Sequence, residues 1–203
     1  MKVEPGDTFY ENLDLSSESY RDLEPRLSQA RYVGDKIPGL YSALPQLFEA
    51  FGPDTRVVMI FRNIFDVAAS WEARRQNPDD NWKRDVAEAV VQWNAALRAY
   101  ASSAYKNQII PVLYEDIYSD PAALTGLLEQ LGLDIGKEDV RRAQTVVTRA
   151  ATLEAGRSRK LSQADLMEIM LKARFGPWRE LVEQLGKVEQ LTTQSAEIVA
   201  PQN

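Results

Sequence analysis

The sequence predicts a helix-rich α/β protein in which helices flank a parallel sheet. Short strand patterns alternate with helical patterns along the chain, and such alternation is typical of parallel sheets with helical connections. The clearest strand is an unbroken apolar run at 57–61, bounded by turn residues as a buried strand would be. No internal repeat or low-complexity linker interrupts the 203 residues, so we expect a single domain over 1–189.

The individual elements follow from apolar spacing and from the residues that begin and end helices. Pro111 lies within a predicted strand and favours an edge, a bulge or a strand start there. Asp120 and Pro121 suit the N-cap and the first position of a helix. Residues 190–203 are expected to form a disordered tail. Strands are predicted at 31–38, 55–62 and 108–116, and helices at 40–51, 65–76, 81–106, 120–131, 137–152, 162–174 and 177–186.

Composition excludes several classes of function. The chain has no cysteine and no histidine, which rules out disulfides, thiolate metal sites and any mechanism that needs an imidazole. We therefore expect no bound metal. The net charge of −6 argues against a nucleic-acid partner, although a local cluster of cations can still bind a small anion. We find no signal peptide and no apolar run of membrane-spanning length, so a cytoplasmic protein without a membrane partner is expected.

A candidate anion site follows the strand predicted at 55–62. Arg62 lies at the carboxyl end of this strand, where ligands bind in open α/β sheets. The next helix directs its first backbone N–H groups the same way, and Ser70 follows Arg62 by eight residues. An arginine, a hydroxyl and a helix N-terminus together suit a phosphate. From spacing alone, the commoner alternative is a surface arginine and a helix serine without a ligand.

Three segments of the chain resemble motifs of the sulfotransferase family. The stretch RVVMIFRNIFDVAASW at 56–71 is similar to the family's 3′-phosphate-binding segment, in which a strand ends in Arg and a Ser follows eight positions later. Ile64 stands where that family usually has Pro. GDKIP at 34–38 resembles the family's lysine-bearing strand end, and VLYEDI at 112–117 resembles a later Tyr-Glu-Asp strand. The motifs occur in the family's order, and the resemblance covers about 30–135.

The resemblance implies a sulfotransferase fold, which has a P-loop-NTPase-like sheet. It also implies transfer of a sulfuryl group from the co-substrate 3′-phosphoadenosine 5′-phosphosulfate to a hydroxyl or amine of a small-molecule or glycan acceptor. The alternative for Tyr114 is a half-buried aromatic, and the alternative for the basic region at 157–161 is a solvated loop. The nucleotide-binding residues that the resemblance implies are Arg62, Ser70, Tyr114, Arg157, Arg159 and Lys160.

Sulfuryl transfer parallels phosphoryl transfer, so cations must stabilise charge on oxygen atoms and a base must accept the acceptor's proton. Lys36 is the candidate cation. Many members of the family have a His two positions after this Lys, where this chain has Pro38, and others have a Glu directly before it. Asp35 occupies the latter position and is the candidate base, with a side chain one methylene shorter than Glu. The alternatives are a solvated Lys36 and an Asp35 that pairs with Lys36 or caps a turn.

The phosphosulfate-binding loop of the family has no counterpart in the sequence. It should lie upstream of residue 30, but residues 1–29 form an atypical segment without a Gly/Ser/Thr-rich loop. With only three predicted strands, we expect an N-terminally truncated chain whose natural start lies upstream of Met1, and such a chain could be inactive. The alternatives are a non-catalytic relic that binds a nucleotide or a partner, and another P-loop-type enzyme such as a kinase, which the missing Walker motif disfavours.

Overall fold

The computed structural model describes residues 25, 28–30, 32–81, 83–155 and 160–186. Contacts within the chain define two units, Met1–Pro38 and Gly39–Asn203. In the first unit the strand predicted at 31–38 is wrong, because residues 32–37 have no regular secondary structure and are exposed. A strand needs a hydrogen-bonded neighbour, and glycine and proline, here Gly34 and Pro38, are unfavourable in strands. The single domain over 1–189 stays a prediction.

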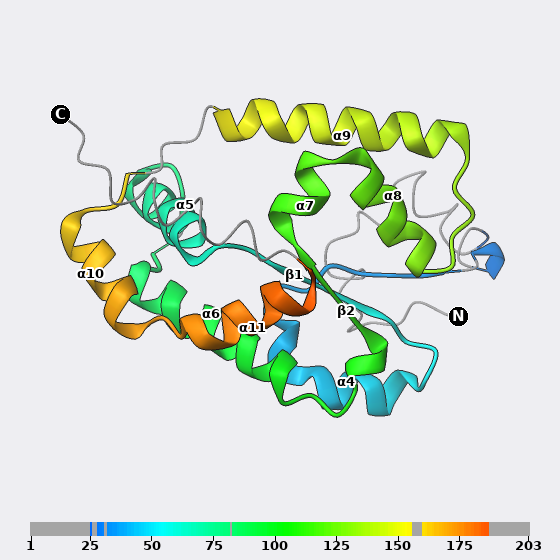
Figure 1. Ribbon diagram of the computed structural model, residues 1–203, viewed down its shortest axis with the longest axis horizontal. Coiled ribbons are helices and arrows are strands. Elements are labelled where there is room, and N and C mark those ends of the chain that lie inside the picture. Colours follow the sequence, from blue (N-terminus) through cyan, green and yellow to red (C-terminus); the bar gives the residue numbers. More distant parts are fainter. Residues whose placement is uncertain (1–24, 26–27, 31, 82, 156–159, 187–203) are drawn as a thin grey trace. The chain divides into compact units, whose positions relative to one another are not determined.

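The second unit contains the elements that form the sheet and the core (Figure 1). Its strands are β1 (Val57–Phe61) and β2 (Ile109–Leu113). The 3-10 helices η1 (Leu40–Ala43) and η2 (Lys106–Gln108) precede α4 and β2. The α-helices are α4 (Leu44–Phe51), α5 (Ile64–Gln76), α6 (Val86–Ala101), α7 (Tyr114–Ser119), α8 (Pro121–Gln130), α9 (Lys137–Ala155), α10 (Gln163–Lys172) and α11 (Phe175–Gln184).

The strands and most helices lie close to their predicted positions, but α6 is shorter than the predicted helix at 81–106. Asp85 is the N-cap of α6, and its carboxylate accepts a hydrogen bond from the backbone N–H of Glu88. Ser102 is the C-cap. The predicted strand at 108–116 is also shorter, because its last residues form the first turn of α7 instead. Capping and the start of a new helix therefore set these boundaries, which apolar periodicity does not mark.

The prediction of a parallel sheet is confirmed, and its register determines which residues meet at its end. β1 and β2 pair in parallel, with Val57 opposite Ile109 and Phe61 opposite Leu113. All four of these residues, which lie at the two ends of the paired strands, are buried. Within the described part of the chain the sheet has two strands, so both are edge strands, and proline at position 111 is tolerated there. The residues directly after β1 and β2 emerge at the same end of the sheet.

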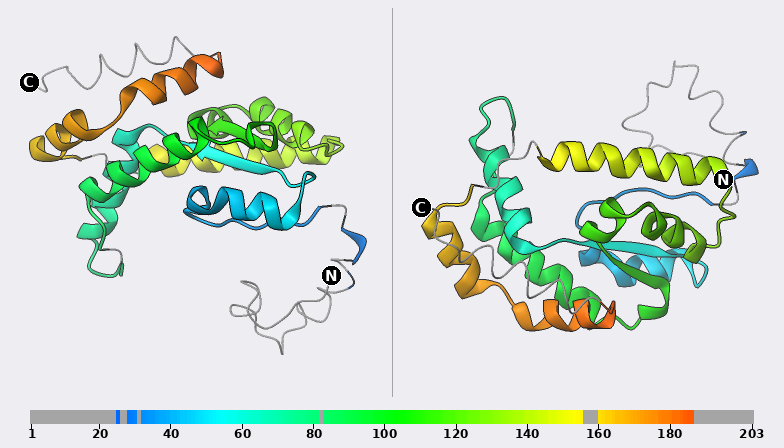
Figure 2. Two further views of the ribbon diagram at one scale, coloured as in Figure 1. Left: turned by 90° about the horizontal axis from the view of Figure 1, so that it is seen from below. Right: turned by 45° about the horizontal axis from the view of Figure 1, so that its top comes forward.

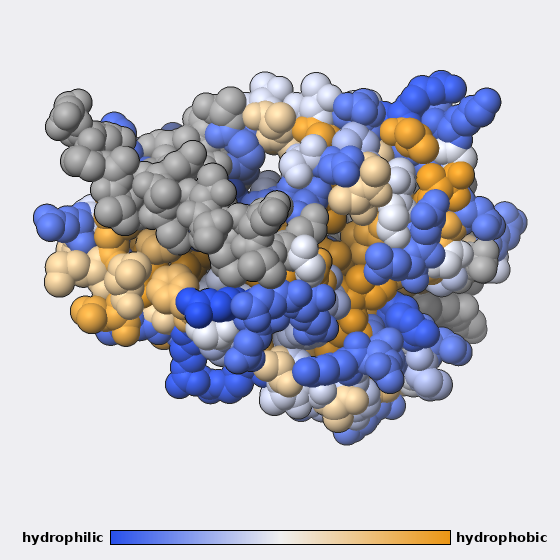
Figure 3. Space-filling model, in the orientation of Figure 1, coloured by the Kyte–Doolittle hydropathy of each residue, from blue (hydrophilic) through white to orange (hydrophobic). Residues whose placement is uncertain are grey.

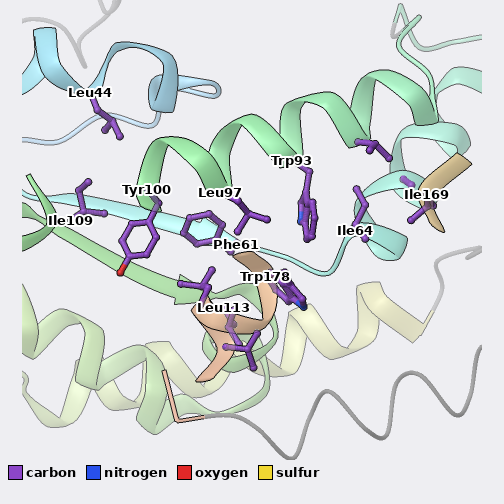
Figure 4. Close-up of a cluster of buried hydrophobic side chains, with 14 of the residues drawn as sticks. Leu44, Phe61, Ile64, Trp93, Leu97, Tyr100, Ile109, Leu113, Ile169 and Trp178 are labelled. Carbon is purple, nitrogen blue, oxygen red and sulfur yellow. The ribbon is translucent and has the colours of Figure 1, made fainter. Parts of the chain in front are cut away.

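The core lies between one face of α6, the two strands and the C-terminal helices (Figure 4). Trp93 and Leu97 project from α6 toward the strands, and both are buried. The indole rings of Trp93 and Trp178 have centroids 5.6 Å apart. Ile169 of α10 has an exposed fraction of 0%. The C-terminal helices therefore complete the core over α6 rather than forming a separate layer of their own.

The helices of the second unit form two packed groups (Figures 1 and 2). α6 packs against α5, α10 and α11, whereas α9 packs against α7 and α8. Three large apolar side chains of α10 are exposed, and Figure 3 shows apolar surface over this helix. They are Met167, Met170 and Leu171. None of the helices in the described part of the chain is long and apolar enough to cross a membrane.

The N-terminus of α8 provides a stability prediction. Asp120 is the N-cap predicted from the sequence, and its Oδ1 atom accepts a hydrogen bond from the backbone N–H of Ala122 at 2.8 Å. We expect Asp120→Ala to lower the free energy of unfolding by about 1 kcal/mol, because that N–H loses its partner. Urea unfolding followed by circular dichroism measures the change. Asp120→Asn keeps the cap and should remain close to the wild type, and equal loss in both variants would contradict the capping role.

Candidate functional site

The register of the sheet brings Arg62 and Tyr114 together. Arg62 directly follows β1, Tyr114 directly follows β2, and the preceding residues of the two strands are opposite one another. The guanidinium carbon of Arg62 lies 4.2 Å from the centroid of the Tyr114 ring. This distance is within the range of a cation–π contact. The Arg62 side chain has an exposed fraction of 15%, so the aromatic ring contacts a largely buried cation.

The backbone around Arg62 is held by neighbouring elements. The indole Nε1–H of Trp93 in α6 donates to the carbonyl oxygen of Arg62 at 2.9 Å. Asn63 is the N-cap of α5, and its Oδ1 atom accepts a hydrogen bond from the backbone N–H of Phe65 at 2.9 Å. The backbone N–H of Asn63 donates to Oε1 of Glu115 at 3.2 Å. The end of β1 is thereby tied to the core helix α6 and to the start of α7.

Carboxylates surround the guanidinium of Arg62. Its Nη2 atom donates to Oε2 of Glu154 at 3.0 Å and lies 3.7 Å from Oδ2 of Asp66. The Tyr114 hydroxyl donates to Oε1 of the same Glu154 at 3.2 Å. The Nε atom of Arg62 is buried and has no hydrogen-bond partner within the described residues. The arrangement is thus a cation that donates a hydrogen bond to one carboxylate, lies beside a second, and has a further buried donor without a partner in the described residues.

Glu115 is the titratable group that this environment perturbs. Burial raises the pKa of Glu115 above its ordinary value of 4.5, and the charge of Asp66 raises it further. The hydrogen bond from the Asn63 backbone and the positive charge of Arg62 act in the opposite direction. Burial is the largest of these effects, so the protonated form of Glu115 is favoured relative to an exposed glutamate.

The direction of this shift predicts how stability depends on pH. A carboxyl group whose pKa is raised on folding binds its proton more tightly in the folded state, so its contribution falls as pH rises above 4.5. Glu115→Gln cannot ionise, and its amide oxygen can still accept from Asn63. We therefore expect this variant to gain stability relative to the wild type as pH rises, with the difference levelling off above the folded-state pKa. Urea unfolding of both proteins from about pH 4 to about pH 8 measures it. A difference that does not vary with pH would contradict the shift.

Of the other predicted nucleotide-binding residues, the structure describes Ser70 and Lys160. Ser70 is half-buried in α5, and among the described residues no hydrogen bond joins it to Arg62. Lys160 is exposed and lies outside any helix or strand. Arg157 and Arg159 lie outside the described residues. Nucleotide binding by these four residues stays a prediction.

Lys36 and Asp35 belong to the first unit, where both are exposed. The backbone N–H of Lys36 donates to Oδ1 of Asp35 at 2.7 Å. The contact does not involve the Lys36 ammonium group, and the catalytic roles of both residues stay predictions.

Sequence reasoning missed the carboxylate that binds Arg62. Glu154 lies near the end of α9, 92 residues after Arg62, and no spacing or motif in the sequence connects the two. Asp66 had a detectable signal, because an acidic residue four positions from an arginine at a helix start is a recognised ion-pair spacing. Trp93 was not among the predicted site residues, but its indole orients the Arg62 backbone.

A comparison with protein families gives one match. A model described as the sulfotransferase family matches residues 6–137, which is more than half of the chain. The matched stretch includes the motifs at 34–38, 56–71 and 112–117. Glu154 and the basic region that follows it lie beyond this stretch. Searches of curated proteins and of solved structures found no match.

Proposed function

This chain belongs to the sulfotransferase family, and we propose that it binds 3′-phosphoadenosine 5′-phosphosulfate and transfers its sulfuryl group to a hydroxyl or amine of a small-molecule or glycan acceptor. Family membership supports a transferase. The nucleotide co-substrate, the P-loop-NTPase-like fold and the class of acceptor are part of the proposal. The observation that carries it is the largely buried Arg62, with its unpartnered Nε donor, between the end of β1 and the N-terminus of α5.

The chemistry around Arg62 suits the 3′-phosphate of such a nucleotide. The Nε–H of Arg62 is a buried donor without a partner in the described residues, and Nη2 points at an anionic group already. Arginine binds phosphate through two parallel N–H donors, so a phosphate could satisfy the donor that Glu154 leaves unused. The first turn of α5 adds the partial positive charge of a helix N-terminus on the same side of Arg62.

Other residues have supporting roles in the proposal. The ring of Tyr114 lies against the guanidinium and restricts the orientation of its plane. Ser70 would donate its hydroxyl to a phosphate oxygen, as its place in the family's motif implies. Arg157, Arg159 and Lys160 would add positive charge to the same phosphate, because a phosphate monoester carries close to two negative charges.

The transfer step requires a cation and a base. The sulfur–oxygen bond to the 5′-phosphate breaks, a bond from sulfur to the acceptor oxygen or nitrogen forms, and 3′-phosphoadenosine 5′-phosphate leaves. Lys36 would stabilise the charge that develops on the leaving oxygen. Asp35 would accept the acceptor's proton. These two assignments rest on the resemblance of GDKIP at 34–38 to the family's lysine motif.

Calorimetric titration of the purified chain with 3′-phosphoadenosine 5′-phosphate tests the nucleotide site. We expect saturable binding of this nucleotide and much weaker binding of adenosine 5′-phosphate, which lacks the 3′-phosphate that Arg62 would hold. Equal affinity for the two nucleotides, or no binding by a folded sample, would contradict the proposal. Circular dichroism of the same sample establishes that it is folded.

A non-catalytic nucleotide-binding protein is the second candidate function. One observation favours it: the cation of the site is engaged by the carboxylates of Glu154 and Asp66. Incubation with radiolabelled 3′-phosphoadenosine 5′-phosphosulfate and a panel of alcohols and amines separates the two functions. Labelled product would establish transfer, whereas nucleotide binding without product from any acceptor would favour the non-catalytic role.

A further inference from the structure

We propose that Glu154 lowers the nucleotide affinity of this site by occupying the position on Arg62 that a phosphate would take. This inference rests on the proposed function, because it concerns the nucleotide that Arg62 would bind. It assigns a role to a residue outside both the predicted site and the stretch that matches the sulfotransferase family. Glu154 would act through Arg62 and set how strongly a phosphate must bind to displace it.

The contacts of Glu154 resemble those of a bound anion. One carboxylate oxygen, Oε2, accepts from Nη2 of Arg62 at 3.0 Å, and the other, Oε1, accepts from the hydroxyl of Tyr114 at 3.2 Å. Both donors come from residues that directly follow the two strands, and sequence reasoning assigned both to the nucleotide. A single carboxylate therefore bridges two groups that are candidates for phosphate binding.

The charges make simultaneous binding unfavourable. Asp66 already lies 3.7 Å from Nη2 of Arg62, so this guanidinium faces two carboxylates before any ligand arrives. A phosphate beside Glu154 would place further negative charge next to a carboxylate in a largely buried setting, where screening by water is weak. Either the carboxylate leaves Arg62 or the phosphate binds poorly. The cost of breaking the ion pair between Arg62 and Glu154 then offsets part of the binding free energy of the phosphate.

The location of Glu154 allows it to leave. It lies in the last turn of α9, and its side chain has an exposed fraction of 20%. A change of side-chain rotamer at a helix end does not require the helix to move. The proposed basic contributors begin three residues later in the sequence, at Arg157.

The test compares the affinity of the wild type and of Glu154→Gln for 3′-phosphoadenosine 5′-phosphate by calorimetry. We expect the variant to bind about five- to tenfold more tightly, because its amide keeps the shape of the side chain but competes weakly for the guanidinium. Glu138→Gln is the matched control, because Glu138 lies on α9 too and forms surface pairs with Arg141 and Arg142. Glu138→Gln makes the same change in net charge far from Arg62, and it should change the affinity for the nucleotide less than about twofold.

The outcomes separate this inference from the proposed function. Tighter binding by Glu154→Gln but not by Glu138→Gln supports the inference. If the wild type binds and Glu154→Gln binds equally or more weakly, Glu154 orients Arg62 instead, and the inference fails while the nucleotide site stands. If neither protein binds, both fail. Glu154→Ala repeats the comparison without an amide, and thermal unfolding establishes that each variant is folded.

Discussion

Replacing Arg62 with alanine is expected to weaken the binding of 3′-phosphoadenosine 5′-phosphate by about 100-fold. The substitution removes the guanidinium that would form charge-assisted hydrogen bonds with the 3′-phosphate. It also leaves the carboxylates of Glu154 and Asp66 facing the same space without their cation, which repels an incoming anion. Arg62→Lys should lose about tenfold, because an ammonium group restores the charge without the planar fork. Calorimetric titration measures both changes.

A matched control separates the local role of Arg62 from the loss of one positive charge. Arg141 is an exposed arginine of α9 that pairs with Glu138, and Arg141→Ala removes the same charge from the surface. Its affinity should stay close to that of the wild type. If Arg62→Ala binds as tightly as Arg141→Ala while both proteins are folded, the 3′-phosphate does not bind at Arg62. The nucleotide site would then have to be sought elsewhere in the chain.

Replacing Trp93 with alanine is expected to lower the free energy of unfolding by about 3–5 kcal/mol. Trp93 is 7% exposed and lies in the core against Trp178 and Phe175, so truncation leaves a cavity that the surrounding helices fill only in part. Urea unfolding followed by circular dichroism measures the loss without relying on tryptophan fluorescence. A decrease in the free energy of unfolding below about 1 kcal/mol would show that the neighbouring core residues move in to fill the cavity left by alanine.

Trp93→Phe tests the second role of this residue. Phenylalanine keeps most of the packing but cannot donate to the carbonyl oxygen of Arg62, which Trp93 Nε1 contacts at 2.9 Å. We expect a smaller loss of stability and, in addition, weaker nucleotide binding, because the end of β1 loses a hydrogen bond that holds it. Trp178→Phe is the matched control: no hydrogen bond from the Trp178 indole occurs within the described residues. Equal nucleotide affinities in the two variants would assign Trp93 to packing alone.

The local elements were predictable because each depends on its own stretch of sequence. The apolar run at 57–61 is β1, and the Asp120–Pro121 pair begins α8 as predicted. The predictions failed where a boundary depends on something outside the pattern. Residues 32–37 form no strand because apolar residues alone do not supply a pairing partner. The helix predicted at 81–106 begins later because the side chain of Asp85 caps its first turn.

Part of the site was predictable for the same reason. Arg62 and Tyr114 were each recognisable as residues at the end of a strand, and the carboxyl ends of parallel strands meet at one edge of a sheet. Their contact at 4.2 Å follows from the pairing register, in which Phe61 is opposite Leu113. The hydrogen bond between Asn63 and Glu115 follows from the same register one residue further along.

By itself, the sequence determined the class of fold, the position of most elements and the motifs of the sulfotransferase family, since periodicity, capping and short motifs are properties of neighbouring residues. Only the tertiary structure decided that Glu154 pairs with the Arg62 guanidinium and that Trp93 holds the Arg62 backbone. The packing of α9 against α7 brings Glu154 to a cation 92 residues earlier in the chain, and α6 brings the Trp93 indole to the Arg62 carbonyl. Contacts of this kind depend on how helices distant in sequence pack in space, and the identities of the two residues give no sign of the pairing.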